Sequence, residues 1–221
     1  MKADLHAHTH FSRDALTSVE TFARRYRRAG IDCVAVSDHN NVDGALAVRE
    51  IAPFQVIVAE EIRSTEGEII GLFLRESVRK GLTPEDTVRA VREQGGLVLV
   101  PHPFDRFRRS PLREEALLRI LPQVDVIEVF NSRTVLQGDD DRARRFAEEH
   151  GKPMSAATDA HTPWEIGLAY TEMPSFEGPG DFLLALGKGK LMGKRSFVGF
   201  HVLSTLAKIR WRLHLGRRIA K

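Results

Sequence analysis

The sequence predicts an α/β fold with a mostly parallel β-sheet, either open or closed. Short apolar or β-branched runs alternate with helix-length segments of mixed polarity along most of the chain, as in a parallel sheet covered by helices. Nearly every one of these runs carries a His, Asp or Glu at its end. A length of 221 residues is ordinary for one α/β domain.

Seven segments have the composition of β-strands. They cover residues 2–8, 32–38, 54–61, 68–74, 95–102, 124–131 and 152–159. The short connection RSTEG between the third and the fourth predicts a hairpin, whereas helix-length segments separate most of the others. The helical segments cover residues 19–30, 43–52, 83–96, 112–123 and 139–151. Thr83 followed by Pro84 is a typical helix start.

The composition is that of a soluble globular protein, with 42% hydrophobic and 29% charged residues. No apolar run is long enough to span a bilayer, and no apolar segment follows Lys2 as in a secretory signal. The single cysteine, Cys33, lies in an apolar run and excludes an internal disulfide. We therefore expect a cytoplasmic protein.

Basic residues accumulate near the end of the sequence, although the net charge is only +3. The segment HVLSTLAKIRWRLHLGRRIAK carries Lys208, Arg210, Arg212, Arg217, Arg218 and Lys221 and no acidic residue. It predicts binding to nucleic acid or another anionic surface, or else a solvated amphipathic helix. We divide the chain into a domain over residues 1–195 and a basic, helical tail over residues 196–221.

Metal-binding residue types gather where the expected strands end. They are His6, His8, Asp38, His39, Glu60, Glu61, His102, Glu128, Asn131, Asp159 and His161, with Glu68 at the start of the fourth strand. Any one of them alone could be a buried histidine or a helix cap. In a parallel α/β fold, however, these ends share one face, and carboxylates and imidazoles packed there need cations to neutralise them. The pattern predicts a multinuclear metal site.

Five motifs carry a resemblance to a known family. DLHAHTHFSRDA, VSDHN, EEI, PHP and TDAH, in this order, resemble the signature motifs of the PHP (polymerase and histidinol phosphatase) family over about residues 1–195. The resemblance implies a distorted (β/α)7 TIM-like barrel. It also implies a metal-dependent phosphoesterase that uses two or three divalent ions, which would be Mn, Fe or Zn.

The resemblance further implies which residues hold the ions. The expected ligands are His6, His8, Glu61 and Asp159 for the first ion, Glu61 and His102 for the second, and Asp14, His39 and His161 for the third. Glu68 stands where relatives often carry a histidine, and we include it because a carboxylate suits a harder ion such as Mn²⁺ or Fe²⁺.

Other polar residues are expected around these ligands. We predict that Asp4 orients an imidazole ring through its free N–H, and that Asp38 does the same beside His39. His10 is expected in the substrate pocket, with Asn131. The arginines that follow the PHP and VFN motifs are Arg106, Arg108, Arg109 and Arg133. Of these we select Arg106 and Arg133 for phosphate contact.

The function expected from these features is hydrolysis of a phosphate ester by a metal-activated water. The substrate would be a small phosphomonoester, a nucleotide or a nucleoside bisphosphate. Three alternatives stay open: an exonuclease that trims short single-stranded RNA or DNA ends, guided by the basic tail; a non-catalytic, metal-stabilised docking module; and a metal-dependent hydrolase of carbon–nitrogen bonds. The motifs GxSxG, HExxH and GxxxxGK[ST] are absent, and the sequence predicts no oligomeric state.

Overall fold

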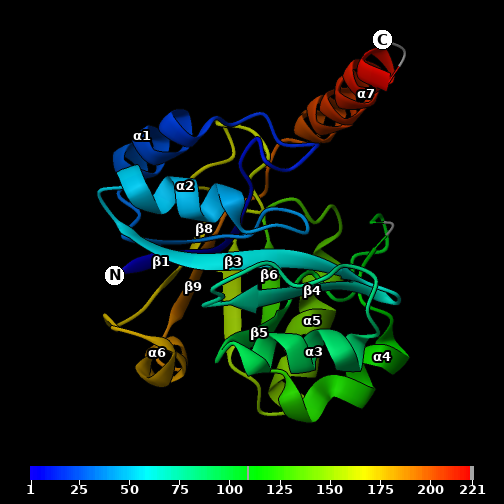
Figure 1. Cartoon of the computed structure of the whole chain (residues 1–221). Coiled ribbons are helices and arrows are strands. Elements are labelled where there is room, and N and C mark those ends of the chain that lie inside the picture. The colour runs from blue at the N-terminus through cyan, green and yellow to red at the C-terminus, as the bar shows by residue number, and fades with distance from the viewer. Residues whose placement is uncertain (109, 220–221) are drawn as a thin grey trace.

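The structure is a computed structural model that describes residues 1–108 and 110–219, with side chains as far as Ile209. Its strands form one sheet that curls into a nearly closed barrel, with helices packed around it (Figure 1). The α/β, TIM-like barrel expected from the sequence is confirmed. Arg109, and the side chains of the basic residues from Arg210 onward, lie outside the described residues.

All seven expected strands are present. They are β1 (Lys2–Ala7), β2 (Cys33–Val36), β3 (Gln55–Ser64), β4 (Gly67–Leu72), β5 (Leu97–Val100), β6 (Val126–Asn131) and β7 (Met154–Ala157). Two more short strands, β8 (Ala169–Glu172) and β9 (Lys190–Gly193), extend the sheet. The strand order is β7-β6-β5-β4-β3-β2-β1-β8-β9. β4 runs antiparallel to both of its neighbours and forms the predicted hairpin with β3, whereas β1 to β3 and β5 to β7 are parallel.

The expected helices also form. They are α1 (Val19–Ala29), α2 (Asp43–Ile51), α3 (Pro84–Glu93), α4 (Glu114–Ile120) with the 3₁₀ turn η1 (Leu121–Gln123), and α5 (Gln137–Glu149). Thr83 caps α3 as predicted, because its hydroxyl accepts a hydrogen bond from the Asp86 N–H at 3.1 Å. Gly30 closes α1 with a φ of 66°, which glycine adopts without steric cost. In Figure 1, α1 and α2 cover one side of the barrel and α3, α4 and α5 the other.

The barrel closes where the segment after β7 pairs with the end of β1. The His8 N–H donates to the Ala160 carbonyl at 3.0 Å, and the Asp159 N–H donates to the His6 carbonyl at 2.8 Å. The closure lies at the carboxyl ends of the parallel strands, the end at which α/β barrels build their sites.

Alternation along the strands separates two apolar clusters. Val34, Val36, Val58, Ile62, Val98 and Val100 pack with side chains of α1 to α5. Cys33, Ala35, Ile57, Ala59, Leu97 and Leu99 form the inner cluster, which also contains Phe182 of α6 (Pro179–Leu186). The two faces thus alternate residue by residue. Neighbouring residues such as Glu60 and Glu61 therefore have opposite surroundings, and only Glu61 shares the inner face.

β8, β9 and α6 are not among the elements predicted from the sequence. β8 and β9 are four residues long, contain Lys, Glu or Gly, and pair antiparallel at one edge of the sheet. The last helix, α7 (Gly199–Ile219), follows β9 and extends away from the barrel (Figure 1). Over the described residues, no helix combines the length and the hydropathy needed to cross a membrane.

We expect Glu60→Gln to stabilise the protein at alkaline pH and to change little at acid pH. Burial raises the pKa of Glu60 from 4.5 to about 7, so the folded protein binds this proton more tightly than the unfolded chain does. The stability that Glu60 contributes is complete below about pH 4.5, falls as the pH rises to about 7, and stays low above it. The gain should be about 1–3 kcal/mol at about pH 8.

Urea unfolding at about pH 5 and about pH 8 measures this difference in stability. Glu115→Gln, at an exposed position of α4, is the matched control and should show no such dependence on pH. An equal effect of Glu60→Gln at both pH values would contradict the argument.

Candidate metal centre

Four buried side-chain atoms from three parts of the chain converge at the mouth of the barrel. The Nε2 atoms of His6 and His8 lie 3.1 Å apart. Glu61 Oε2 lies 3.5 Å from the first nitrogen and 3.4 Å from the second. Asp159 Oδ1 lies 3.5 Å from His6 Nε2 and 3.2 Å from His8 Nε2. All four side chains are at most 1% exposed.

These spacings fit a bound cation. Ligands about 2.0–2.2 Å from a tetrahedral ion lie about 3.3–3.6 Å from one another, and neighbouring ligands of an octahedral ion somewhat closer. Glu61 Oε2 and Asp159 Oδ1 are buried and have no hydrogen-bond partner among the residues that the structure describes, which a protein interior tolerates only if something else satisfies them. Two imidazole nitrogens and two free carboxylate oxygens are suitable donors for a divalent ion of the Mn, Fe or Zn type.

Two further groups of atoms adjoin this centre. The second oxygen of Glu61, Oε1, lies 3.2 Å from His102 Nε2. On the other side, Asp14 Oδ1 lies 3.4 Å from His39 Nε2 and 3.6 Å from His161 Nε2, and this oxygen too is buried without a hydrogen-bond partner. His39 Nδ1 lies 3.0 Å from Glu61 Oε2, so His39 connects the group around Asp14 with the centre.

Glu68 lies at the edge of the same cluster. Ligand atoms of His39, Glu61 and Glu68 all lie within 4.8 Å of one another. Ser110 donates its hydroxyl to Glu68 Oε1 at 2.8 Å. The structure therefore brings all nine predicted ligand residues into one region.

Local backbone geometry directs these side chains inward. A register shift between Asp4 and Ala7 interrupts the alternation of β1, and Ala7 packs with the outer helices. The neighbours of Ala7, His6 and His8, consequently face the mouth. His102 and Asp159 have positive φ angles of 31° and 52°, which non-glycine residues adopt rarely and mostly at functional sites.

The imidazole rings are oriented by buried hydrogen bonds. Glu128 Oε1 lies 3.0 Å from His6 Nδ1, and Oε2 of the same carboxylate accepts the main-chain N–H of His102 at 2.8 Å. Glu128 follows the strand-end pattern, but the sequence analysis gave it no role. Asp4 was predicted to orient an imidazole, but its described partners are other groups. It accepts hydrogen bonds from the Tyr26 hydroxyl at 2.8 Å and from the Thr158 main-chain N–H at 3.0 Å.

Asp38 is connected to an imidazole through the hydroxyl of Ser12. It accepts the hydroxyl hydrogen of Ser12 at 2.6 Å, and Ser12 Oγ lies 3.2 Å from His8 Nδ1. The expected partner of Asp38 was His39, but the described contacts lead to His8. The His39 main-chain N–H donates to the same Ser12 oxygen at 3.0 Å. The Ser12 hydroxyl therefore contacts both His8 and His39.

The structure places the arginines differently from the prediction, which selected Arg106 and Arg133 for phosphate contact. Arg108, which we had not selected, forms an ion pair with Asp159 and lies 3.2 Å from Asp105. Arg106 pairs with Asp139 at 2.9 Å and leaves 67% of its side chain exposed. Arg133 is buried, lies 3.5 Å from Glu165 and donates to Ser204 of α7 at 3.0 Å.

The other two predicted pocket residues, Asn131 and His10, have different surroundings. Asn131 is buried and donates its amide to Glu128 Oε2 at 2.9 Å, so it supports the second oxygen of that carboxylate. His10 is exposed and packs its ring beside Phe11, with ring centroids 4.8 Å apart. Between these two, only Asn131 belongs to the hydrogen-bond network beneath the centre.

The charges of the centre are strongly interdependent. Burial disfavours the ionised form of Glu61, but His6 and His39 hold the pKa of this carboxyl well below its usual range. For Asp159, burial is likewise outweighed by Arg108 and His6, which lower its pKa. Burial together with Arg133 lowers the pKa of His161, which favours the neutral imidazole that metal binding requires.

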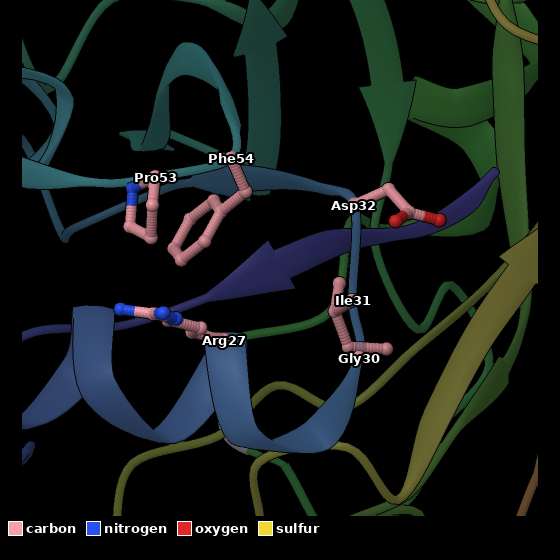
Figure 2. Close-up of a pocket in the computed structure, with 6 residues that line it drawn as sticks. All are labelled: Arg27, Gly30, Ile31, Asp32, Pro53 and Phe54. Carbon is pink, nitrogen blue, oxygen red and sulfur yellow. The ribbon is translucent and has the colours of Figure 1, made fainter.

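A separate surface pocket of about 220 Å³ lies at the opposite end of the barrel. Its lining includes Arg27, Asp32 and Phe54, at the starts of β2 and β3 (Figure 2). The guanidinium of Arg27 and the carboxylate of Asp32 point away from one another (Figure 2). A ligand site needs polar groups that converge, and these two do not.

Comparison with known proteins gives consistent results. The family model described as PHP domain matches residues 4–74, and the one described as PHP-associated matches residues 139–191. An uncharacterized protein of Methanocaldococcus jannaschii is 34% identical in an alignment that covers 98% of this chain and 90% of that protein.

Two solved structures have similar folds. One is a two-domain protein from Bacteroides vulgatus that contains a predicted PHP-like metal-dependent phosphoesterase, with a TM-score of 0.72, 20% identity and 88% of this chain covered. The other is a lesion-specific endonuclease from Pyrococcus furiosus, with a TM-score of 0.65, 16% identity and 86% covered. The chain spans 65% of the first protein and 57% of the second.

We expect Glu128→Gln to weaken binding of a divalent ion by about tenfold or more. The exchange keeps the shape of the side chain but removes the negative charge that orients His6 and increases its basicity. Competition between the protein and a chromophoric chelator for Mn²⁺ or Zn²⁺ measures the affinity. Glu115→Gln is the matched control, and equal affinities of the two variants would show that Glu128 does not support the centre.

Proposed function

The chain belongs to the PHP family, and from this premise we propose that it hydrolyses phosphate esters with water at a cluster of divalent ions. One observation carries the proposal. The Nε2 atoms of His6 and His8 lie 3.1 Å apart, and each lies 3.2–3.5 Å from Glu61 Oε2 and Asp159 Oδ1. Among the described residues, these two carboxylate oxygens have no hydrogen-bond partner.

The residues proposed to hold the ions form three overlapping groups. They are His6, His8, Glu61 and Asp159 for the first, Glu61 and His102 for the second, and Asp14, His39 and His161 for the third. Glu61 can bridge because its two oxygens face different histidines. Glu68 is proposed as an additional carboxylate ligand on the basis of its distance from His39 and Glu61.

Divalent ions in such a cluster supply Lewis-acid activation of water and of the phosphoryl group. The chain's own residues fix the geometry. Glu128 and Ser12 hold the rings of His6 and His8, so these rings need no reorganisation when substrate binds. Arg108, at the rim beside Asp159, presents a planar guanidinium that suits two oxygens of a phosphoryl group.

The charges around the mouth support the substrate class that we propose. Arg108 and Arg133 lie at or beside the centre, and Lys208 of α7 lies 2.6 Å from Asp14 Oδ2. These cations favour a small anionic ester, a nucleotide or a nucleoside bisphosphate. Trimming of nucleic-acid ends is a second candidate. The lesion-specific endonuclease among the structures of similar fold indicates that such a fold can accommodate nucleic acid, without favouring strand ends.

We expect metal-dependent release of phosphate from at least one ester class. The panel contains phosphomonoesters, nucleoside bisphosphates and short single-stranded oligonucleotides, each assayed with Mn²⁺ and with chelator. His39→Ala and Asp159→Ala should each lower kcat by at least about a hundredfold, because each removes a proposed ligand. His150→Ala, an exposed histidine outside the centre, is the matched control.

The best substrate decides between a small-molecule phosphatase and a nuclease. Protein with its full metal content but no turnover on any ester would contradict the proposal. That result would favour a docking module or a hydrolase of carbon–nitrogen bonds.

We further expect Arg108→Ala to lower kcat/KM by about 10- to 100-fold, mainly through KM, because it removes a charge-assisted contact to the phosphoryl group. Arg106→Ala should change kcat/KM by less than about twofold. Metal content is measured for both variants, which separates loss of substrate contact from loss of ions through Asp159. A larger loss in Arg106→Ala would instead favour the arginine selected from the sequence.

A further inference from the structure

The first half of α7 has one side that packs on the barrel. Arg133 donates to Ser204 at 3.0 Å, and Lys208 Nζ lies 2.6 Å from Asp14 Oδ2. Ser204 and Ala207 are buried. These contacts fix the direction in which α7 leaves the barrel (Figure 1).

The opposite side of α7 and the two residues before the helix form an apolar surface that no other described residue covers. We call it the α7 stripe, and it consists of Phe197, Val198, Val202, Leu206 and Ile209, which are 49–73% exposed. Val202, Leu206 and Ile209 recur at the three- and four-residue spacing of a single helix face. At the base of the helix, Trp164 is 56% exposed and lies parallel to Phe200, with ring centroids 6.1 Å apart. Contiguous exposed apolar side chains of this kind mark an interaction surface.

The charge of the surrounding sequence identifies what the stripe contacts. From Phe182 onward the sequence contains no Asp or Glu but ten of the 33 Lys and Arg residues. The 181 residues before it hold the other 23 basic residues and all 30 acidic ones. The partner must therefore offer an apolar interior and an anionic surface together.

We propose that α7 docks on an anionic phospholipid bilayer, lying in the interface with the α7 stripe toward the acyl chains. Aliphatic side chains find no apolar surface on a phosphodiester backbone, but they partition into the acyl boundary of a bilayer. Basic residues of the same segment are attracted to anionic headgroups. A second copy of the chain is a poor partner, because pairing would bring two acid-free basic segments together.

Docking in this way has a consequence for the site. Ser204 and Lys208 hold α7 against residues of the barrel mouth, so docking of α7 would set the orientation of the barrel mouth relative to the bilayer. The docking inference does not depend on catalysis, and it can be tested without any turnover.

Flotation with lipid vesicles tests the proposal on the full chain. Vesicles of phosphatidylcholine with about 30% phosphatidylglycerol should bind the protein at low salt and release it at about 0.5 M salt, and phosphatidylcholine alone should not bind it. Val202→Ser with Leu206→Ser should weaken binding about tenfold or more. Leu184→Ser, a 72% exposed position on α6, is the matched control and should bind normally. If the double variant fails to fold by circular dichroism, Leu206→Ala replaces it.

The charge requirement is tested by two matched quadruple variants. Exchange of Arg210, Arg212, Arg217 and Arg218 for Gln should abolish binding to the anionic vesicles. The same exchange at the exposed residues Arg24, Arg28, Arg49 and Arg145 should change binding less than about fivefold. Equal losses in the two variants would overturn the proposal.

Three further results would also overturn it. The protein could fail to bind vesicles, or the substitutions in the α7 stripe could leave vesicle binding unchanged. The third result is that the tail binds a labelled single-stranded oligonucleotide and not vesicles. Hydrolysis of a soluble ester is assayed without vesicles. Failure of the proposed function is therefore visible separately from failure of docking.

Discussion

The pairing of the segment after β7 with the end of β1 is the constraint on which the rest of the structure depends. Two main-chain hydrogen bonds, from His8 to Ala160 and from Asp159 to His6, bring residues from opposite ends of the domain sequence together. They place Asp159 beside His6 and His8, and they close the barrel at the same time. These main-chain hydrogen bonds set the distance between Asp159 and the two histidines. Loss of the closure would therefore move Asp159 away from His6 and His8 and separate the ligands proposed for the first ion.

Closure creates an electrostatic problem that shapes the surrounding hydrogen bonds. Glu61, Asp159 and Asp14 are at most 3% exposed, and each has an oxygen without a hydrogen-bond partner. Unpaired buried carboxylates are costly, so the fold supports them with histidines, with Arg108 on Asp159 and with Lys208 on Asp14. These cations neutralise outer oxygens and leave the inner ones facing the cluster. Charge pairing thus outweighs burial and keeps these carboxylates ionised.

Much of the architecture could be predicted from the sequence because it depends on local patterns. Strands, helices and the β3–β4 hairpin follow from apolar periodicity and turn composition. The metal-binding region could be predicted as well, because residues at the ends of parallel strands must meet. Periodicity also explains why Glu61 and not Glu60 faces the centre, since alternate residues of β3 occupy opposite sides of the sheet. β8 and β9 could not be predicted, because each is only four residues long and depends on pairing with strands distant in the sequence.

Contacts between distant residues set the limit of prediction within the site. Arg106, Arg108 and Arg133 lie at similar distances from the motifs in sequence, yet one is mostly exposed, one pairs with Asp159 and one lies beneath α7. Which arginine reaches a ligand depends on the fold of the loop and on partners such as Asp139 and Glu165. Asp4 and Glu128 differ for the same reason. Both are buried carboxylates on neighbouring parts of the barrel, but only Glu128 contacts an imidazole ring.

The contact between Lys208 and Asp14 joins the two parts of the molecule that the sequence treats as separate. Asp14 presents Oδ1 to His39 and His161 and Oδ2 to Lys208, so one carboxylate belongs both to the proposed third ion site and to the anchor of α7. A movement of α7 would change the charge beside this carboxylate, and the affinity of an ion bound at Asp14 as proposed would depend on that charge. Thermodynamic reciprocity would then couple ion binding to the position of α7.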